Sequence, residues 1–205
     1  MIGNKKNSKI NIIGQSLEKA ISYKEYRELV AEHVLNGTTT GPQQTEALAN
    51  YTLLNHSRMK RLDKTVKIPD DVREKFESFE GDQTWLVLTE SWCGDAAQSM
   101  PAMNKLAELA PNIDLKVVQR DENLELMSQF LTNGSQSIPK LIVVDNSTGE
   151  VLQTWGPRPT IATQMVNDFK EKHGALTPQF KQDLQVWYNR DRSANIIDDL
   201  SRLID

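Results

Sequence analysis

The chain has 205 residues, of which 38% are hydrophobic and 25% charged, and its formal net charge is −4. This composition is typical of a folded globular protein, and its mild acidity argues against nucleic acid or an anionic membrane surface as a partner. No apolar run approaches the roughly 18 residues of a membrane span, and no apolar stretch of a secretory signal follows the basic start. A cytoplasmic protein is therefore expected. The single cysteine, Cys93, agrees with that compartment, because one sulfur cannot form a disulfide within the chain.

Residues 1–65 carry helix signals and are predicted to form an N-terminal helical extension. Ser22 is followed three residues later by Glu25, the spacing of a capping box, which predicts that a helix begins there. A second helix is predicted over 43–61. Its inner face is only partly apolar, so we expect it to pack on another element rather than to form a core of its own.

Residues 66–175 alternate strand and helix signals and are predicted to form the main domain. Short apolar runs indicate buried strands, and segments with helical spacing indicate the helices between them. The predicted strands span 84–89, 115–118, 140–144 and 150–155, and the predicted helices span 94–110, 122–132 and 160–172. The short connection between the last two strands predicts an antiparallel hairpin. This order predicts an α/β fold, a mixed sheet with helices on both faces.

Residues 176–205 are predicted to form a C-terminal helical extension. Thr177 is suited to cap a helix, and Pro178 occupies its first position, where proline is favoured. Polar residues dominate between Asn189 and Asp199, which predicts one long, solvated helix.

The order of elements, together with residues near the expected sheet edge, resembles the thioredoxin fold. Trp92-Cys93-Gly94 stands between the first apolar strand and the next helix, where thioredoxins carry their Trp-Cys-Gly-Pro-Cys loop. Pro101 corresponds to the proline that kinks the helix after that loop. Ile138-Pro139 precedes the third strand, where the family has a cis-proline facing the active-site sulfur.

The resemblance covers about residues 80–173. Gly156 stands near the place of a further family glycine beside the site. The form Trp-Cys-Gly-Asp-Ala is similar to that of uncharacterised bacterial thioredoxin-like proteins with helical additions at both ends.

Three departures from the family pattern concern the redox chemistry. Ala96 stands at the second cysteine, and Asp95 replaces the proline before it. Val87 stands where thioredoxins have a buried acidic residue on the preceding strand. The resemblance thus implies that the ordinary dithiol cycle is absent.

Cys93 is the candidate catalytic residue, because a thiolate is the nucleophile in disulfide exchange. A helix N-terminus favours the thiolate, whereas the like charge of Asp95 opposes it. Arg158, in a loop expected beside the site, would favour it. With one sulfur, Cys93 forms a mixed disulfide that only an external thiol such as glutathione resolves.

Two functions of different class remain open. The first is monothiol exchange or reduction of a protein disulfide or a glutathione mixed disulfide through Cys93. The second is a non-catalytic module whose groove beside Cys93 and Pro139 holds an extended peptide. Iron–sulfur carriage, as in monothiol glutaredoxins, is a weaker alternative because their Cys-Gly-Phe-Ser loop is not matched.

No cofactor is expected from the sequence, and no metal site either. The three histidines, His33, His56 and His173, lie in separate predicted helices without the spacing of metal ligands.

Overall fold

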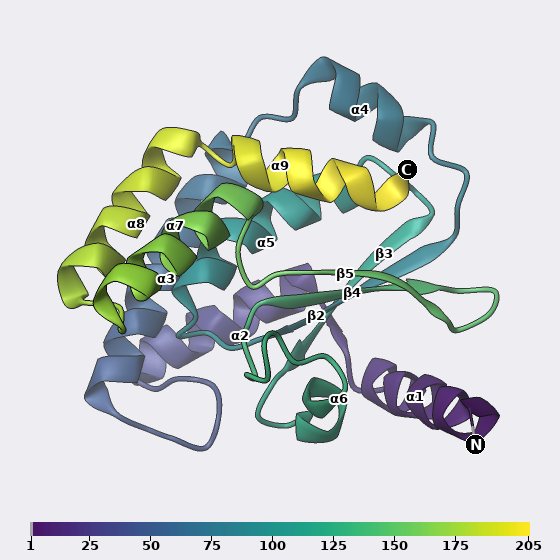
Figure 1. Ribbon diagram of the computed structural model, residues 1–205, viewed down its shortest axis with the longest axis horizontal. Helices are drawn as coiled ribbons and strands as arrows, with labels where there is room; N and C mark the ends of the chain where they lie inside the picture. The colour runs from purple at the N-terminus through teal and green to yellow at the C-terminus, as the bar shows by residue number, and fades with distance from the viewer. Residues whose placement is uncertain (1) are drawn as a thin grey trace.

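The structure, a computed structural model, describes residues 2–205 (Figure 1). Its strands are β1 (Ile21–Ser22), β2 (Gln83–Thr89), β3 (Ile113–Gln119), β4 (Lys140–Asp145) and β5 (Val151–Trp155). Its helices are α1 (Ile2–Leu17), α2 (Tyr23–Asn36), α3 (Glu46–Thr65), α4 (Asp70–Glu77), α5 (Gly94–Ala107), α6 (Leu124–Ser128), α7 (Thr160–His173), α8 (Pro178–Asp191) and α9 (Ala194–Ser201), followed by a 3₁₀ turn (Arg202–Ile204).

The five strands form one mixed sheet in the order β1-β3-β2-β4-β5. β2 and β3 are parallel, whereas the other neighbours are antiparallel. In the middle of the sheet, Val87 of β2 lies opposite Val117 of β3 and Leu141 of β4. Every residue of β2 is buried, which explains why its sequence is a continuous apolar run rather than an alternating one. The mixed α/β sheet expected from the sequence is confirmed.

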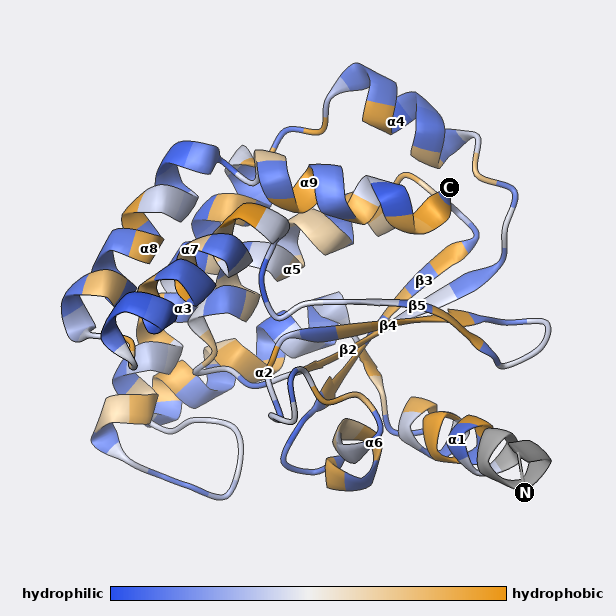
Figure 2. Ribbon diagram, viewed as in Figure 1, coloured by the Kyte–Doolittle hydropathy of each residue, from blue (hydrophilic) through white to orange (hydrophobic). Residues whose placement is uncertain are grey.

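Helices cover both faces of this sheet (Figure 1). α5, α7 and α9 lie on one face, whereas α1 and α6 lie on the other. α3 packs against α5 and also against α2, so the N-terminal extension is joined to the helix that follows the candidate loop. Figure 2 shows apolar residues concentrated in the central strands and polar residues on the outer faces of the helices.

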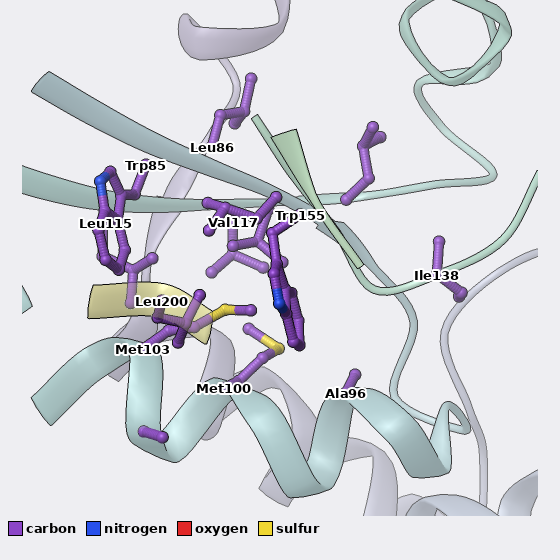
Figure 3. Packing of buried hydrophobic residues seen from close by; sticks show 14 of the residues in the cluster. Trp85, Leu86, Ala96, Met100, Met103, Leu115, Val117, Ile138, Trp155 and Leu200 are labelled. Atoms are coloured by element: carbon purple, nitrogen blue, oxygen red, sulfur yellow. The ribbon is translucent and has the colours of Figure 1, made fainter. Parts of the chain in front are cut away.

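The core between α5 and the sheet consists of large, fully buried side chains (Figure 3). Met100 and Met103 point from α5 towards the sheet, where Trp155 of β5 and Leu200 of α9 meet them. Both methionines are completely buried. Flexible thioethers fill such irregular gaps between helix and sheet well.

The helix α2, the second of the N-terminal extension, begins as the sequence predicts. The Ser22 side chain accepts a hydrogen bond from the Glu25 N–H, and the Glu25 carboxylate accepts one from the Ser22 N–H. The helix predicted over 43–61 is α3. It is capped by Thr45 and ends at Thr65, four residues beyond its predicted end. Within residues 2–205, no helix has the length and apolar character needed to cross a lipid bilayer.

Some elements differ from the sequence prediction. The two-residue strand β1 owes its conformation to pairing with β3, a contact that no local pattern reveals. The helix expected over 122–132 is reduced to the five residues of α6. The helix α1 falls within the predicted helical extension but was not predicted as a separate helix, and α4 was not expected.

The prediction of one long, solvated C-terminal helix is wrong. Arg192 and Ser193 both adopt left-handed backbone conformations, with φ of +53° and +69°, and end α8. The chain then turns into α9, whose Ile196 and Leu200 are completely buried. Its polar residues misled the sequence analysis, because one of them, Asp199, is paired inside the protein.

Asp199 joins α9 to the end of the sheet and to α7. Its carboxylate accepts hydrogen bonds from Trp155 Nε1 at 3.1 Å, from the Thr160 N–H at 2.8 Å and from Thr160 Oγ1 at 2.8 Å. The side chain is 9% exposed. The Trp155 side chain is buried, so the Asp199 carboxylate satisfies its N–H and holds α9 against the end of the sheet.

We predict that Asp199→Ala lowers the free energy of unfolding by about 1–3 kcal/mol, because it leaves the buried Trp155 N–H without an acceptor. Asp198→Ala is the matched control. Its carboxylate is exposed and pairs with Arg202 one turn away, so the expected loss is below about 0.5 kcal/mol. Urea unfolding followed by circular dichroism measures both, and equal stability of the two variants would contradict this role.

Candidate functional site

Cys93 is the N-cap of α5, in the loop that joins β2 to that helix. Its sulfur accepts a hydrogen bond from the Ala96 N–H at 3.5 Å, as a capping side chain does. The backbone N–H of Cys93 donates to the carbonyl of Glu90 at 3.1 Å, which closes the turn. The sequence therefore located the cysteine correctly at the start of a helix.

The thiol of Cys93 is buried against the segment before β4. Only 7% of the residue is exposed, and its Sγ–H donates to the carbonyl oxygen of Ile138 at 3.3 Å. The Ile138–Pro139 peptide bond is cis, the geometry that the resemblance led us to expect. A donated S–H bond and a dry surrounding both favour the protonated sulfur.

Burial raises the pKa of the Cys93 thiol to about 12, and the negative charge of Asp95 acts in the same direction. The N–H groups of Ala96 and Asp95 and the charge of Arg158 oppose this shift without overcoming it. The sequence analysis weighed the helix N-terminus against Asp95 but not the loss of water. Desolvation is the larger effect here, so Cys93 is a thiol at neutral pH.

Asp95 is held by two partners from distant parts of the chain. Arg158 Nη2 forms an ion pair with one carboxylate oxygen at 2.7 Å, and the Tyr188 hydroxyl donates to the other at 3.0 Å. Burial raises the pKa of Asp95, while Arg158 and Tyr188 pull it down. Arg158 thus lies near the site, as expected, but its direct partner is Asp95 rather than the sulfur.

Gly156 is required by the close approach of two backbones. Its φ is +108°, and a Cβ on it would lie 2.2 Å from the carbonyl oxygen of Pro139. Any side chain there would displace the segment that faces Cys93. The next peptide bond, Gly156–Pro157, is also cis, which the sequence analysis did not foresee.

The structure thus brings most of the expected site residues together around Cys93. Trp92 lies differently, since its half-buried ring faces the guanidinium of Arg120, 5.0 Å from the ring centroid. Gly94 faces the N-terminal extension, because a Cβ there would lie 3.5 Å from a guanidinium nitrogen of Arg58.

A buried cluster of hydroxyl groups, which the sequence analysis missed, ties the N-terminal extension to the cysteine loop. Ser91 Oγ accepts from the Thr40 N–H at 3.0 Å and lies within 3.0 Å of the Thr39 hydroxyl and 2.8 Å of the Thr52 hydroxyl. Asn55 Nδ2 donates to the Ser91 carbonyl at 3.0 Å. All five residues are at most 1% exposed. Thr52 and Asn55 are polar residues on the inner face of the helix predicted over 43–61. Their position there was the one sign in the sequence of such a buried polar contact.

The C-terminal extension covers the other side of the same loop. Besides the Tyr188 hydroxyl on Asp95, Gln185 of α8 accepts a hydrogen bond from Gln98 of α5 at 2.9 Å. The first turn of α5 is consequently enclosed by α3 on one side and by α8 on the other.

Glu90, directly before the loop, is a second buried acid that the sequence analysis did not single out. It is completely buried, and one of its oxygens accepts from the Asp121 N–H at 2.9 Å. Burial raises the pKa of this carboxyl group.

Among residues 2–205, no three His, Cys, Asp or Glu side chains are placed to hold a metal ion. The hydrogen bonds of Cys93 described above join it to backbone groups of Glu90, Ala96 and Ile138, and not to a second sulfur or a metal-binding side chain.

The comparison with protein families agrees with this geometry. A family model described as thioredoxin matches residues 41–170, well over half of the chain. The chain belongs to the thioredoxin family. The match includes α3 with Thr52 and Asn55, which lie before the segment for which the sequence resemblance was recognised. No curated protein matches the chain in sequence.

Two solved structures share the thioredoxin-like fold of this family member. One is a protein of unknown function from Pseudomonas aeruginosa, with a TM-score of 0.57 and 20% identity, covering 90% of this chain and 97% of that one. The other is an HIV epitope scaffold, with a TM-score of 0.55 and 20% identity, covering 90% of this chain and 98% of the scaffold. Because these alignments span nearly the whole chain, the likeness of fold includes most of the helical extensions.

We predict that Ser91→Ala destabilises the protein by about 2–3 kcal/mol, because the buried Thr40 N–H and the neighbouring hydroxyls lose a shared partner. Ser57→Ala serves as the control. Ser57 is exposed on α3 and bonds only to the carbonyl of Leu53, so its loss should change stability by less than about 0.5 kcal/mol. The measurement is urea unfolding, and a Ser91 variant as stable as the control would show that the cluster does not anchor the loop.

Proposed function

We propose that this thioredoxin-family protein acts as a binding module, and that its Cys93 thiol is part of the binding surface rather than a turnover nucleophile. The observation that carries the proposal is the buried Sγ, which donates its proton to the Ile138 carbonyl. Because burial raises the pKa of this thiol to about 12, its ionised fraction at pH 7 is far below the few per cent of an ordinary cysteine.

The absence of a second sulfur points in the same direction. Ala96, where the family has its resolving cysteine, is 1% exposed and packs in the core. Asp95 is engaged by Arg158 and Tyr188, so it is not free to move a proton to or from the sulfur. Neither residue supplies a step of the dithiol cycle.

The segment before β4 is the surface that we propose for partner binding. Residues 133–136 are exposed and lead directly into the buried Ile138-Pro139 pair beside Cys93. The Ser135 backbone groups are already bonded within this turn, so an extended peptide would pair with the neighbouring backbone groups, and nearby side chains would select its sequence. The helical extensions on both sides of the loop would contribute to that selection.

Two measurements test this proposal. Reduction of insulin disulfides with glutathione as the external thiol should proceed at the same rate with the parent protein, with Cys93→Ser and without protein. Peptides selected from a displayed library under reducing conditions should bind the parent and Cys93→Ser equally and shift the amide NMR signals of residues 133–137. Turnover above the Cys93→Ser level, or peptides retained only through a reducible bond, would contradict a binding role.

A second candidate, monothiol exchange, is favoured by one observation, the placement of Cys93 as N-cap with the Ala96 N–H directed at its sulfur. In that reaction the thiolate attacks one sulfur of a glutathione mixed disulfide or a protein disulfide, and the other sulfur leaves as a thiolate. An external thiol such as glutathione then attacks the mixed disulfide and releases Cys93.

Oxidised glutathione distinguishes the two candidates. Monothiol exchange requires the folded chain to gain one glutathione, visible as a single mass shift that Cys93→Ser lacks. The binding module instead predicts that the folded chain stays unmodified while the urea-unfolded chain gains the adduct.

A further inference from the structure

An open cavity of about 290 Å³ lies between α3 and the end of α8, away from the Cys93 sulfur. Its floor is apolar and formed by Leu62 and Val66, which are both buried. Its polar wall is formed by side chains from both helical extensions: Arg61, Thr65, Tyr188, Asn189 and Arg192. This volume lies at the lower end of the range for small-molecule sites, about 300 Å³, so the cavity suits a small ligand.

The cavity is positively charged and contains no acidic lining residue. Among the described side chains, neither Arg61 nor Arg192 lies within ion-pair distance of a carboxylate. Arg61 instead donates to the neutral amide oxygen of Asn189 at 2.8 Å. A third guanidinium, Arg58, lies one turn before Arg61 on α3, and its partner is the amide of Asn55 at 3.0 Å.

The pKa of Arg58 gives separate evidence that the charge of Arg61 lies close to it. Burial and the charge of Arg61 both lower the pKa of Arg58. The acid whose charge acts on Arg58 is Asp95, and Arg158 already forms an ion pair with it. The C-terminal ends of α3 and α8 offset part of this positive charge through their dipoles, but no acidic side chain lines the cavity.

The backbone at Arg192 is unusual for a residue with a side chain. Arg192 ends α8 in the left-handed conformation, with φ of +53°, and its N–H donates to the Tyr188 carbonyl. Glycine is the common residue at such a position, because a Cβ there is disfavoured. An arginine at a position better suited to glycine points to a use for its side chain, which here faces the cavity.

We propose that this cavity binds a small anion with a phosphate or carboxylate group, held between the guanidinium groups of Arg61 and Arg192. Planar guanidinium groups bind both kinds of oxyanion through paired hydrogen bonds. Thr65 and Asn189 would supply further polar contacts. The bound anion would join the N-terminal extension to the C-terminal extension, which is a function beyond the peptide binding proposed for the Cys93 surface.

The test is an NMR titration of the full chain with inorganic phosphate and, separately, with citrate, at an ionic strength kept constant with sodium chloride. We expect saturable shifts confined to amides of residues 61–66 and 188–193. A response to phosphate alone or to citrate alone would identify which oxyanion the site prefers. Arg61→Ala and Arg192→Gly should each weaken the affinity about tenfold or more.

Arg190→Ala is the matched control, since it removes the same charge from an exposed position of the same helix outside the cavity. Its affinity should stay within about twofold of the parent. Arg192→Gly should also retain or raise the melting temperature, because glycine suits the left-handed position, which separates lost binding from lost folding. Shifts that do not saturate, or an equal loss of affinity in Arg190→Ala, would overturn the proposal.

Discussion

The exclusion of water from the first turn of α5 is the constraint on which the properties of this site depend. A helix N-terminus ordinarily stabilises a thiolate through its free N–H groups and its dipole, by about 0.3–1 kcal/mol at an exposed position. Here α3 and α8 enclose that turn, and burial dominates the pKa of Cys93. The same enclosure explains why Asp95 has both an ion pair and a hydroxyl partner, because a buried carboxylate without them would be costly.

The two helical extensions therefore belong to the site rather than being appendages of the thioredoxin-like sheet. The N-terminal one supplies the hydroxyl cluster around Ser91, and the C-terminal one supplies Tyr188. Ala96, at the position of the second cysteine, is buried in this enclosed turn, so Cys93 has no resolving sulfur beside it. The retained features, the cis Ile138–Pro139 bond and Gly156, are those that shape the backbone facing Cys93.

The sequence predicted correctly those elements whose conformation depends on neighbouring residues. The apolar run of β2, the capping box at Ser22 and the position of Cys93 before α5 could all be recognised from neighbouring residues. What could not be predicted depends on partners far along the chain. Asp199 looks like a solvated residue until Trp155 and Thr160 are brought to it, and the pKa of Cys93 depends on burial by helices far from it in the sequence.

The most direct test of this account is the ionisation of Cys93 itself, followed through its ¹³Cβ chemical shift as the pH is raised. Because burial disfavours the charged form, the pKa is raised and the proton should remain on the sulfur from pH 7 to beyond about pH 10. The urea-unfolded chain should titrate near the ordinary value of about 8.5. A midpoint in the folded protein at or below about 8.5 would contradict the account, because it would mean that the helix N-terminus, and not desolvation, governs the thiol.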